Sequence, residues 1–358
     1  MTYQPQFGLC NQLRALHQAI AIAKVLGRVL IIPDIIDNDG QGPIYRRDTL
    51  FNNEVLIDAL RRSSIPSLSM ASYTKLQLPP PTFLLDLKLS SFKQLIPSNL
   101  YYDNLGWSRL PVIPAESLEK YTGTMKGYDE KAWRSWATND QERVLGAPLL
   151  AMTTTYGAWQ GAKDFAFKVW HSEIESYVYQ ESEWISRLLE TIIQGNEALQ
   201  NGFMCAHVRR GNFKKACHMY DEEYESGNPR SWVKQFYEKH LSCYVNDKVF
   251  SDQVGAVMET LGKRAMPILL VTNDHRFAER VQTENPNMKI LTLSQAIDLQ
   301  SLFQPAIPVI EMSLCSRANI LLANQYSTFS RGIFKKALWQ HAWMIKNSFA
   351  WSKGQVGR

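Results

Sequence analysis

No apolar run of about 18 or more residues, the minimum for a membrane-spanning helix, occurs in this 358-residue sequence. The sequence also has no signal-peptide pattern, no Asn-x-Ser/Thr sequon and no tract of disordered composition. It contains no recognisable module that reads the grooves of a nucleic acid. These absences predict a folded chain with no membrane segment and no nucleic-acid partner. They favour the cytoplasm, or the lumen of the Golgi or endoplasmic reticulum if the chain is a piece of a longer protein.

Cysteine is scarce, and its spacing excludes the common cysteine-based sites. The five cysteines are Cys10, Cys205, Cys217, Cys243 and Cys315. No pair has metal-ligand spacing, and an odd number cannot all be joined in disulfides. Cys205 and Cys315 lie in apolar segments, so we interpret both as core residues, and the odd count favours a reducing compartment.

What the sequence does contain is enough apolar material for two domains. It is 45% hydrophobic and 11% aromatic, with a formal charge of +5. A positive balance favours anionic ligands, but lysine and arginine are dispersed among acids, which indicates a nucleotide rather than a nucleic acid. In the second half, apolar runs alternate with helical patterns, which predicts a parallel sheet. Strands are expected near 203–208, 267–272, 288–292 and 318–322, and helices near 183–194, 230–245, 250–262, 275–284 and 329–346.

The expected strand at 203–208 delivers two adjacent guanidiniums to one point. Arg209 and Arg210 follow the apolar run directly, and Gly211 permits a sharp exit. The planar fork of arginine matches phosphate oxygens better than the ammonium of lysine does. The pattern therefore predicts a phosphate site. The alternative is a pair of solvated arginines at a strand end.

Two other segments have the form of anion sites at helix starts. Near the amino terminus, a glycine-containing loop at 7–12 leads into an alanine- and leucine-rich helical pattern that ends at Gly27, and an apolar strand at 29–32 follows. Late in the chain, an apolar strand ends before Ser327 and Thr328, which are good helix caps. The free N–H groups of a helix start bind anions. The alternatives are an ordinary α/β opening and simple capping.

Taken together, these segments resemble the fucosyltransferase superfamily that contains the α-1,2-, α-1,6- and protein O-fucosyltransferases. Residues 7–12 are similar to its glycine-rich Asn-Gln opening, and residues 207–212 are similar to its His-x-Arg-Arg-Gly-Asp motif. Residues 327–330 are similar to its Ser-Thr-Phe-Ser motif, and residues 269–274 to a strand that ends in Thr/Ser-Asp-Asp. The motifs span nearly the whole chain, although residues 34–200 match none of them.

The resemblance implies an α/β fold of GT-B architecture, with two Rossmann-like domains facing a cleft. Residues 1–180 would form the acceptor side and residues 181–358 the donor side. The implied activity is an inverting, metal-independent transfer of fucose from GDP-fucose to a hydroxyl of a glycan or glycoprotein, with no cofactor. A preorganised guanidinium can stabilise the departing diphosphate in place of a divalent cation, which agrees with this expectation.

Roles for individual residues follow from the matched motifs. Arg209 takes the position of the essential arginine on the β-phosphate, and Asn11 is expected near the reacting sugar. Asn319 stands where some relatives carry an aspartate that reads the guanine. No motif assigns a catalytic base, and the candidates are Asp34, His218 and Glu222, each of which is alternatively a solvated loop residue. The residues expected to bind the donor are Gly8, Leu9, Cys10, His207, Arg209, Arg210, Asn212, Thr272, Asn273, Asp274, Asn319, Ser327, Thr328, Phe329 and Ser330.

Departures from the motifs leave two alternatives open. Asn212 and Asn319 replace aspartates, and Cys10 stands where relatives often have glycine. One alternative keeps the fold and changes the donor to xylose, rhamnose or another sugar on a nucleotide. The other is a non-catalytic module that binds a nucleotide sugar or a glycan. An Asp-x-Asp triplet at 37–39, a pattern that holds Mn²⁺ elsewhere, is interpreted as a turn because glycine and proline follow it. The acceptor, the linkage and the oligomeric state do not follow from the sequence.

Overall fold

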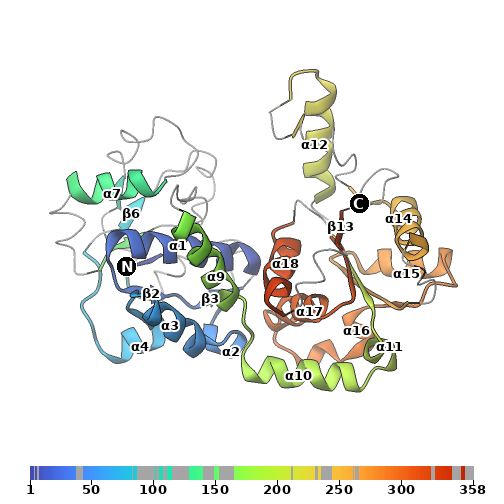
Figure 1. The fold of residues 1–358 in the computed structure, drawn as a ribbon, viewed down its shortest axis with the longest axis horizontal. Helices are drawn as coiled ribbons and strands as arrows, with labels where there is room; N and C mark the ends of the chain where they lie inside the picture. The colour runs from blue at the N-terminus through green and yellow to red at the C-terminus, as the bar shows by residue number, and fades with distance from the viewer. Residues whose placement is uncertain are drawn as a thin grey trace. The chain divides into compact units, whose positions relative to one another are not determined.

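The chain is a mixed α/β protein that divides into two compact units, Met1–Trp184 and Ile185–Arg358 (Figure 1). The division lies close to the boundary at 180/181 expected from the sequence. The structure, a computed structural model, describes residues 1–358 except 4, 6–7, 38–42, 83, 87–100, 102–104, 108–109, 111, 115–128, 140–148, 153–164, 211–212, 230–232, 235–243, 261, 263–265, 324–326, 341–347 and 351–358.

The first unit is built on short parallel strands. One sheet has the order β1-β8-β6-β7, and these strands are β1 (Thr2–Tyr3), β8 (Ala151–Met152), β6 (Leu84–Asp86) and β7 (Val112–Pro114). A second parallel pair is formed by β2 (Leu30–Ile32) and β5 (Ser67–Ser69). The Ile31 N–H donates to the Met1 carbonyl at 2.8 Å, which places β2 beside the start of β1. An antiparallel pair, β3 (Ile35–Ile36) and β4 (Ile44–Tyr45), follows β2.

The helix expected after the amino-terminal loop is α1 (Leu9–Leu26), and it is buried along most of its length. Its alanine and leucine content favours the helix, and Gly27 ends it in the left-handed conformation, with φ 62°. The other helices of this unit are α2 (Arg47–Leu50), α3 (Asn53–Arg62), α4 (Met70–Lys75), α7 (Glu130–Asn139) and α9 (Phe165–Val178).

The second unit contains the parallel sheet that the sequence predicted. Its strands are β9 (Met204–Val208), β10 (Ile268–Thr272), β11 (Ile290–Leu291), β12 (Ile320–Ala323) and β13 (Ser348–Ala350), paired in the order β11-β10-β9-β12-β13. Counted along the chain from β9, this order is 3-2-1-4-5, the order of a Rossmann-type sheet. All five residues of β9 are buried, because β9 lies between β10 and β12 with helices on both faces.

Helices connect these strands and cover the sheet (Figure 1). They are α10 (Glu183–Gln194), α11 (Glu197–Gln200), α12 (Phe213–Glu225), α14 (Asp247–Thr260), α15 (His275–Glu284), α16 (Leu293–Ala296), η3 (Leu299–Ser301), α17 (Ala306–Ser316) and α18 (Thr328–Gln340). Most of the helix expected at 230–245 lies outside the described residues.

The side chains of β9 alternate between the two faces of the sheet, as in any strand. Met204 and Ala206 belong to the apolar core that includes Phe250 of α14 and Phe277 of α15. Cys205, on the opposite face, is joined to Cys315 of α17, with the two Cα atoms 5.2 Å apart. One face of β9 is therefore covered by α14 and α15, and the other face by α17.

The disulfide corrects the interpretation of Cys205 and Cys315. Both are buried core residues, as expected, but they are covalently paired across 110 residues of sequence. Cys217 is also disulfide-bonded. Among the described residues Cys10 is the free cysteine, and it is buried. An odd total therefore leaves one thiol unpaired and does not argue against disulfides.

Candidate functional site

The candidate site lies at the carboxyl edge of the sheet in the second unit, between β9 and β12. In an open parallel sheet, the strand order reverses at one point, and ligands bind outside the carboxyl ends of the strands there. In the order β11-β10-β9-β12-β13 this point falls between β9 and β12. Arg209 follows β9 directly, and Thr328 begins α18 after β12. The structure thus brings together the arginine and hydroxyl segments that are about 120 residues apart in the sequence.

A buried contact joins these two segments directly. The Nδ1 atom of His207 and the Oγ atom of Ser330 lie 2.7 Å apart in a hydrogen bond, and the His207 ring lies 4.8 Å from the ring of Phe329. Burial, with a smaller contribution from the charge of Arg209, lowers the pKa of His207 to about 3. The imidazole is therefore neutral at physiological pH, and we assign it to holding β9 against the start of α18.

Arg209 and the first turn of α18 present positive charge and N–H groups at the same edge. Arg209 is partly exposed. The Oγ atom of buried Ser327 accepts the N–H of Phe329 at 3.2 Å, so this serine caps the helix. Thr328 is partly buried at the first position of α18. A guanidinium beside a helix amino terminus is suited to a diphosphate, because both favour negative charge.

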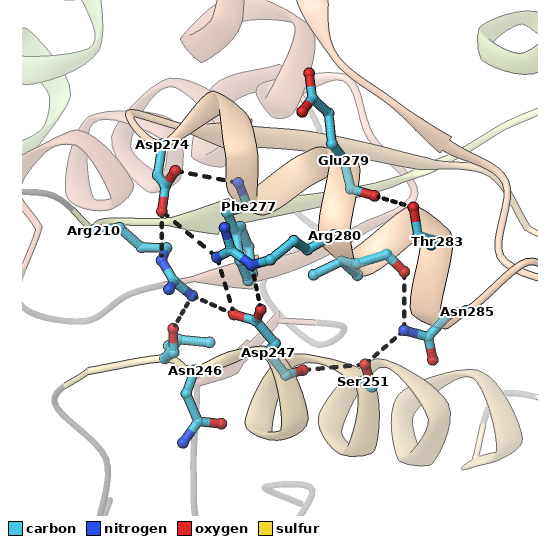
Figure 2. A network of polar contacts seen from close by, with 12 residues as sticks. Arg210, Asn246, Asp247, Ser251, Asp274, Phe277, Glu279, Arg280, Thr283 and Asn285 are labelled. Carbon is cyan, nitrogen blue, oxygen red and sulfur yellow. Dashed lines mark hydrogen bonds and ion pairs between the residues drawn. The ribbon is translucent and has the colours of Figure 1, made fainter.

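The Arg210 side chain, which was expected to bind the donor, faces Asp247 and Asp274 (Figure 2). Its side chain is 7% exposed, and its Nη1 atom donates to the Val245 carbonyl at 2.9 Å. Ion pairs join it to Asp247 at 3.0 Å and to Asp274 at 3.1 Å. Val208 belongs to the same apolar cluster as Phe277, and Arg210 packs against Phe277, so Arg210 lies on the face of α14 and α15. The guanidinium of Arg210 is therefore paired with carboxylates of the protein, which is a structural role.

The segment after β10 is also occupied by internal contacts. The Thr272 hydroxyl accepts the Asp274 N–H at 3.2 Å, and Asp274 in turn caps α15 by accepting the Phe277 N–H at 3.2 Å. The Asn273 amide oxygen accepts the Arg210 N–H at 2.8 Å. These three residues lie at the carboxyl edge, as the motif implied, but their polar atoms serve the protein backbone and Arg210.

Asn319 lies at the wrong edge of the sheet to read a base beside Arg209. It precedes β12, so it stands at the amino edge, and its Oδ1 atom accepts the Phe203 N–H at 2.9 Å. Gly202 packs against it with φ 88°, and a Cβ atom at that glycine would lie 2.2 Å from the Asn319 Oδ1 atom. The asparagine therefore fastens the start of β12 to the start of β9. This position gives no support to the expected role of Asn319 in donor binding.

A cavity at the carboxyl end of β10 contains a carboxylate that the motifs did not reveal. The cavity has a volume of about 740 Å³ and is lined by residues of β10, α15, α16 and α17, among them Thr272, Leu293 and Glu311. Burial raises the pKa of Glu311 to about 8. Its sequence signal is a single acidic residue in an otherwise uncharged helix, Ala306–Ser316. A partly buried carboxylate in a roomy cavity is suited to a ligand with paired N–H donors.

In the first unit, the predicted residues lie at the start of α1. Gly8 is the N-cap, Leu9 is partly exposed, and Cys10 is buried. Asn11 is partly exposed, and its buried Oδ1 atom has no hydrogen-bond partner among the described residues. The neighbouring Gln12 is structural: its amide donates to the Ile36 carbonyl at 2.6 Å and accepts the Ile36 N–H at 3.1 Å.

The three candidates for a catalytic base have different environments. Asp34 follows β2, is partly buried, and accepts the Arg47 N–H at 3.1 Å, and burial raises its pKa. His218 and Glu222 lie one turn apart on α12, 3.6 Å from each other, with side chains 74% and 66% exposed. That is the environment of a solvated helix pair. Asp34 is therefore the better supported candidate.

Some expectations fall outside what the structure describes. Gly211 and Asn212 of the arginine motif, and two residues of the Asp-x-Asp triplet, belong to segments that it does not describe. In the described part of the chain, no group of three or more His, Cys, Asp or Glu side chains is arranged to hold a metal ion. No helix in that part combines the length and apolar character needed to span a membrane.

Comparisons with known proteins support the fold. No protein-family model and no curated protein sequence matches this chain. Among solved structures, POFUT1 in complex with GDP-fucose is similar, with a TM-score of 0.69, 14% identity, and coverage of 98% of this chain and 96% of that chain. The apo form of POFUT1 has a TM-score of 0.66, 16% identity, and coverage of 98% and 97%. The fucosyltransferase NodZ from Bradyrhizobium has a TM-score of 0.42, 13% identity, and coverage of 93% and 92%. Over nearly its whole length, this chain has the fold of POFUT1.

Proposed function

We propose that this protein is a fucosyltransferase that transfers fucose from GDP-fucose to a hydroxyl of a glycan or a protein. The observation that carries the proposal is the position of Arg209 at the end of the central strand, beside the start of α18, where the strand order reverses. The resemblance of the motifs to fucosyltransferases supports it. So does the shared fold with POFUT1, which was solved with GDP-fucose.

The diphosphate is assigned to Arg209 and the first turn of α18. In an inverting transfer, the acceptor oxygen forms a bond to C1 of fucose while the bond from C1 to the β-phosphate oxygen breaks. GDP leaves with the electron pair of that bond, so negative charge grows on the β-phosphate. The guanidinium and the N–H groups near Ser327 and Thr328 stabilise that charge without a metal ion. The proposal thus includes a metal-independent reaction, with no cofactor and with GT-B architecture.

The guanine base is assigned to the cavity that contains Glu311. An ionised carboxylate accepts the N1–H and N2–H donors of guanine together, which a uracil or adenine base does not offer in the same pattern. Glu311 is carried by α17 and the cavity opens at the carboxyl end of β10, next to β9 in the sheet. Glu311 is therefore the proposed base-reading residue, and it favours a guanine nucleotide over the UDP-sugar alternative.

The acceptor hydroxyl is assigned to the first unit. The buried amide oxygen of Asn11 has no hydrogen-bond partner among the described residues, and we assign it to a sugar hydroxyl. Asp34 is the proposed general base, which takes the proton of the acceptor hydroxyl as the new bond to C1 forms. The raised pKa of its carboxyl makes it a stronger base than an exposed aspartate. His218 and Glu222 are left without a proposed catalytic role.

We also propose that the protein folds in an oxidising compartment. Cys205 is paired with Cys315, and Cys217 is disulfide-bonded as well. Disulfides persist in the secretory pathway and are rare in the cytosol. The lumen of the endoplasmic reticulum or Golgi is therefore preferred over the cytoplasm. Mass spectrometry of the non-reduced protein purified from its native cells tests this, and free thiols at Cys205 and Cys315 would exclude it.

The test of function compares nucleotides and then transfer. Calorimetric binding of GDP, UDP, GDP-fucose, GDP-mannose, GDP-rhamnose and UDP-xylose is measured in chelator and again with Mn²⁺. We expect metal-free binding of GDP and a preference for GDP-fucose. A UDP preference, or a strict requirement for Mn²⁺, would refute the fucosyl assignment. Binding of GDP-fucose with neither transfer to any acceptor nor slow hydrolysis would favour the non-catalytic alternative.

Arg209→Ala is the variant that addresses the central residue. We expect transfer to fall about 100-fold or more, because removal of one such donor to a developing anion typically costs that much. Guanosine, which lacks phosphate, should bind as tightly as to the unmodified protein. Arg187→Ala is the matched control, since Arg187 is an exposed arginine of α10 in the same unit. Unchanged transfer by Arg209→Ala would remove the basis of the proposal.

A further inference from the structure

We propose that Asp247 and Arg280, acting through Arg210 and Asp274, are positioning residues for Arg209. These four residues are called the Arg210 network below. The inference rests on the proposed function, because it concerns how Arg209 is held for a diphosphate. Neither Asp247 nor Arg280 belongs to any of the sequence motifs.

The network alternates positive and negative groups (Figure 2). Asp247 lies between the two arginines, with its Oδ1 atom 3.0 Å from Arg210 Nη1 and its Oδ2 atom 2.7 Å from Arg280 Nε. The Oδ2 atom of Asp274 lies 3.1 Å from Arg210 Nε and 3.9 Å from Arg280 Nη2. Each carboxylate therefore contacts both guanidiniums. The network joins the end of β9 to the starts of α14 and α15.

Arg210 is held tightly because its charge is buried. Its guanidinium carbon lies 4.2 Å from the ring centre of Phe277 and 4.9 Å from that of Tyr244. A buried cation is stable only when partners compensate its charge, and removing one partner leaves that charge exposed to an apolar environment. Asp247 is a strong partner, since its bond to Arg280 keeps the pKa of its carboxyl below the usual range and the group ionised at neutral pH.

The main chain of Arg210 is held from a third direction. Its N–H donates to the Asn273 amide oxygen at 2.8 Å, and its carbonyl accepts from the Asn273 amide nitrogen at 3.4 Å. The side chain and the main chain of the residue directly after Arg209 are therefore both fixed. The charge of Arg209 contributes to the lowered pKa of His207, so Arg209 lies near that side of the sheet, and we infer that fixing Arg210 toward α14 and α15 keeps Arg209 directed toward His207 and α18.

This arrangement supplies the preorganisation that a catalytic cation needs. A donor that is already in place when charge develops stabilises the transition state without reorganisation, and a displacement of about 1 Å can cost about 100-fold in rate. Loosening the Arg210 network should therefore weaken the interaction with the diphosphate and leave the guanine cavity intact. A role confined to stability would affect both parts of the nucleotide together.

Asp247→Asn tests the inference, with Asp252→Asn as its matched control. Asp252 lies on the same helix and pairs with Lys248 at 3.0 Å, but both side chains are exposed. We expect Asp247→Asn to weaken GDP binding about tenfold or more while guanosine affinity changes less than about twofold. The kcat for donor hydrolysis or transfer should fall more than KM rises. Asp247→Glu should restore part of the loss, and Asp252→Asn should change nothing.

Other outcomes decide against the inference. If Asp247→Asn weakens GDP and guanosine binding in parallel with a lower Tm, or changes neither, the network does not position Arg209. If Asp247→Asn does not fold, Arg280→Lys gives the same comparison. The lysine keeps the positive charge at a side chain that is 43% exposed, but it lacks the planar guanidinium that contacts Asp247. An unmodified protein that binds no GDP refutes the proposed function, and this inference with it. If the unmodified protein binds GDP but Asp247→Asn does not give the expected result, the positioning role of the Arg210 network is refuted and the proposed function is not.

Discussion

Arg209 and Arg210 show how one step along the chain changes the role of a residue. They are the same residue type and adjoin the same buried strand. Arg210 points to the face of α14 and α15, where Asp247 and Asp274 neutralise it. Arg209 belongs to the face of His207, whose pKa its charge helps to lower. The face on which each side chain lies, and not its chemistry, separates the structural ion pairs of Arg210 from the phosphate contact proposed for Arg209.

Glu311 carries a prediction about pH. Because burial raises its pKa to about 8, the empty site holds the neutral acid at pH 6 to 7. In the proposed recognition, guanine binds to the ionised form of Glu311, so binding must release a proton below that pKa. The affinity for GDP should therefore rise with pH, by up to about tenfold per unit, and level off above about pH 8.

Calorimetry in buffers of different ionisation enthalpy measures the proton released with GDP. Glu311→Gln should bind GDP more weakly and with no such pH dependence below pH 8. Glu279→Gln is the control, because Glu279 lines the same cavity but is exposed on α15. Affinity that is independent of pH in the unmodified protein would contradict the assignment of Glu311 to the base.

At the scale of elements, β9 is the centre of the second unit. It pairs with β10 and β12, carries Arg209 at its end, and is linked to α17 by the disulfide between Cys205 and Cys315. The same disulfide therefore ties the strand of the phosphate contact to the helix of Glu311. The two regions proposed to contact one nucleotide are thus linked by a covalent bond and by the sheet.

Removing this link should destabilise the second unit. Cys205→Ala combined with Cys315→Ala opens a closed loop across 110 residues of sequence. The chain-entropy model gives a loss of about 3 to 5 kcal/mol in the free energy of unfolding. Urea denaturation of the double variant against the unmodified protein, both oxidised, measures the loss. A change below about 1 kcal/mol would mean that packing alone holds β9 against α17.

At the scale of the whole molecule, the residues assigned to the donor all belong to one unit. Arg209, Glu311 and the start of α18 lie in Ile185–Arg358, whereas Asn11 and Asp34 lie in Met1–Trp184. Each unit has its own sheet and its own apolar cluster. In the proposed function, the donor is therefore bound by the second unit and the acceptor by the first.

Thermal unfolding should reveal this division. We expect two transitions in calorimetry, one for each unit. GDP at about 100 times its Kd should stabilise one of them by about 2.7 kcal/mol, because ligands stabilise the folded state that they bind. UDP at the same concentration should have a much smaller effect. The double cysteine variant identifies the transition of the second unit, and a GDP effect confined to the other transition would contradict the assignment of the donor site.

The sequence by itself determined the parts of this protein that depend on local patterns. Apolar runs specified β9 and β12, helix formers and Gly27 specified α1, and Asp274 capped α15 where its pattern begins. The motifs also placed Arg209 at a strand end. Hydrophobic periodicity and capping involve residues a few positions apart, so they are visible without the fold.

Only the tertiary structure decided which of the motif residues face the site. Three features depend on contacts between residues that are 37 to 116 positions apart in the sequence. They are the burial of Arg210, the position of Asn319 at the amino edge of the sheet, and the pairing of Cys205 with Cys315. The cavity around Glu311 exists only where β10, α15 and α17 meet. Such contacts depend on strand order and on which face of the sheet each helix covers, and neither quantity is encoded within a single segment.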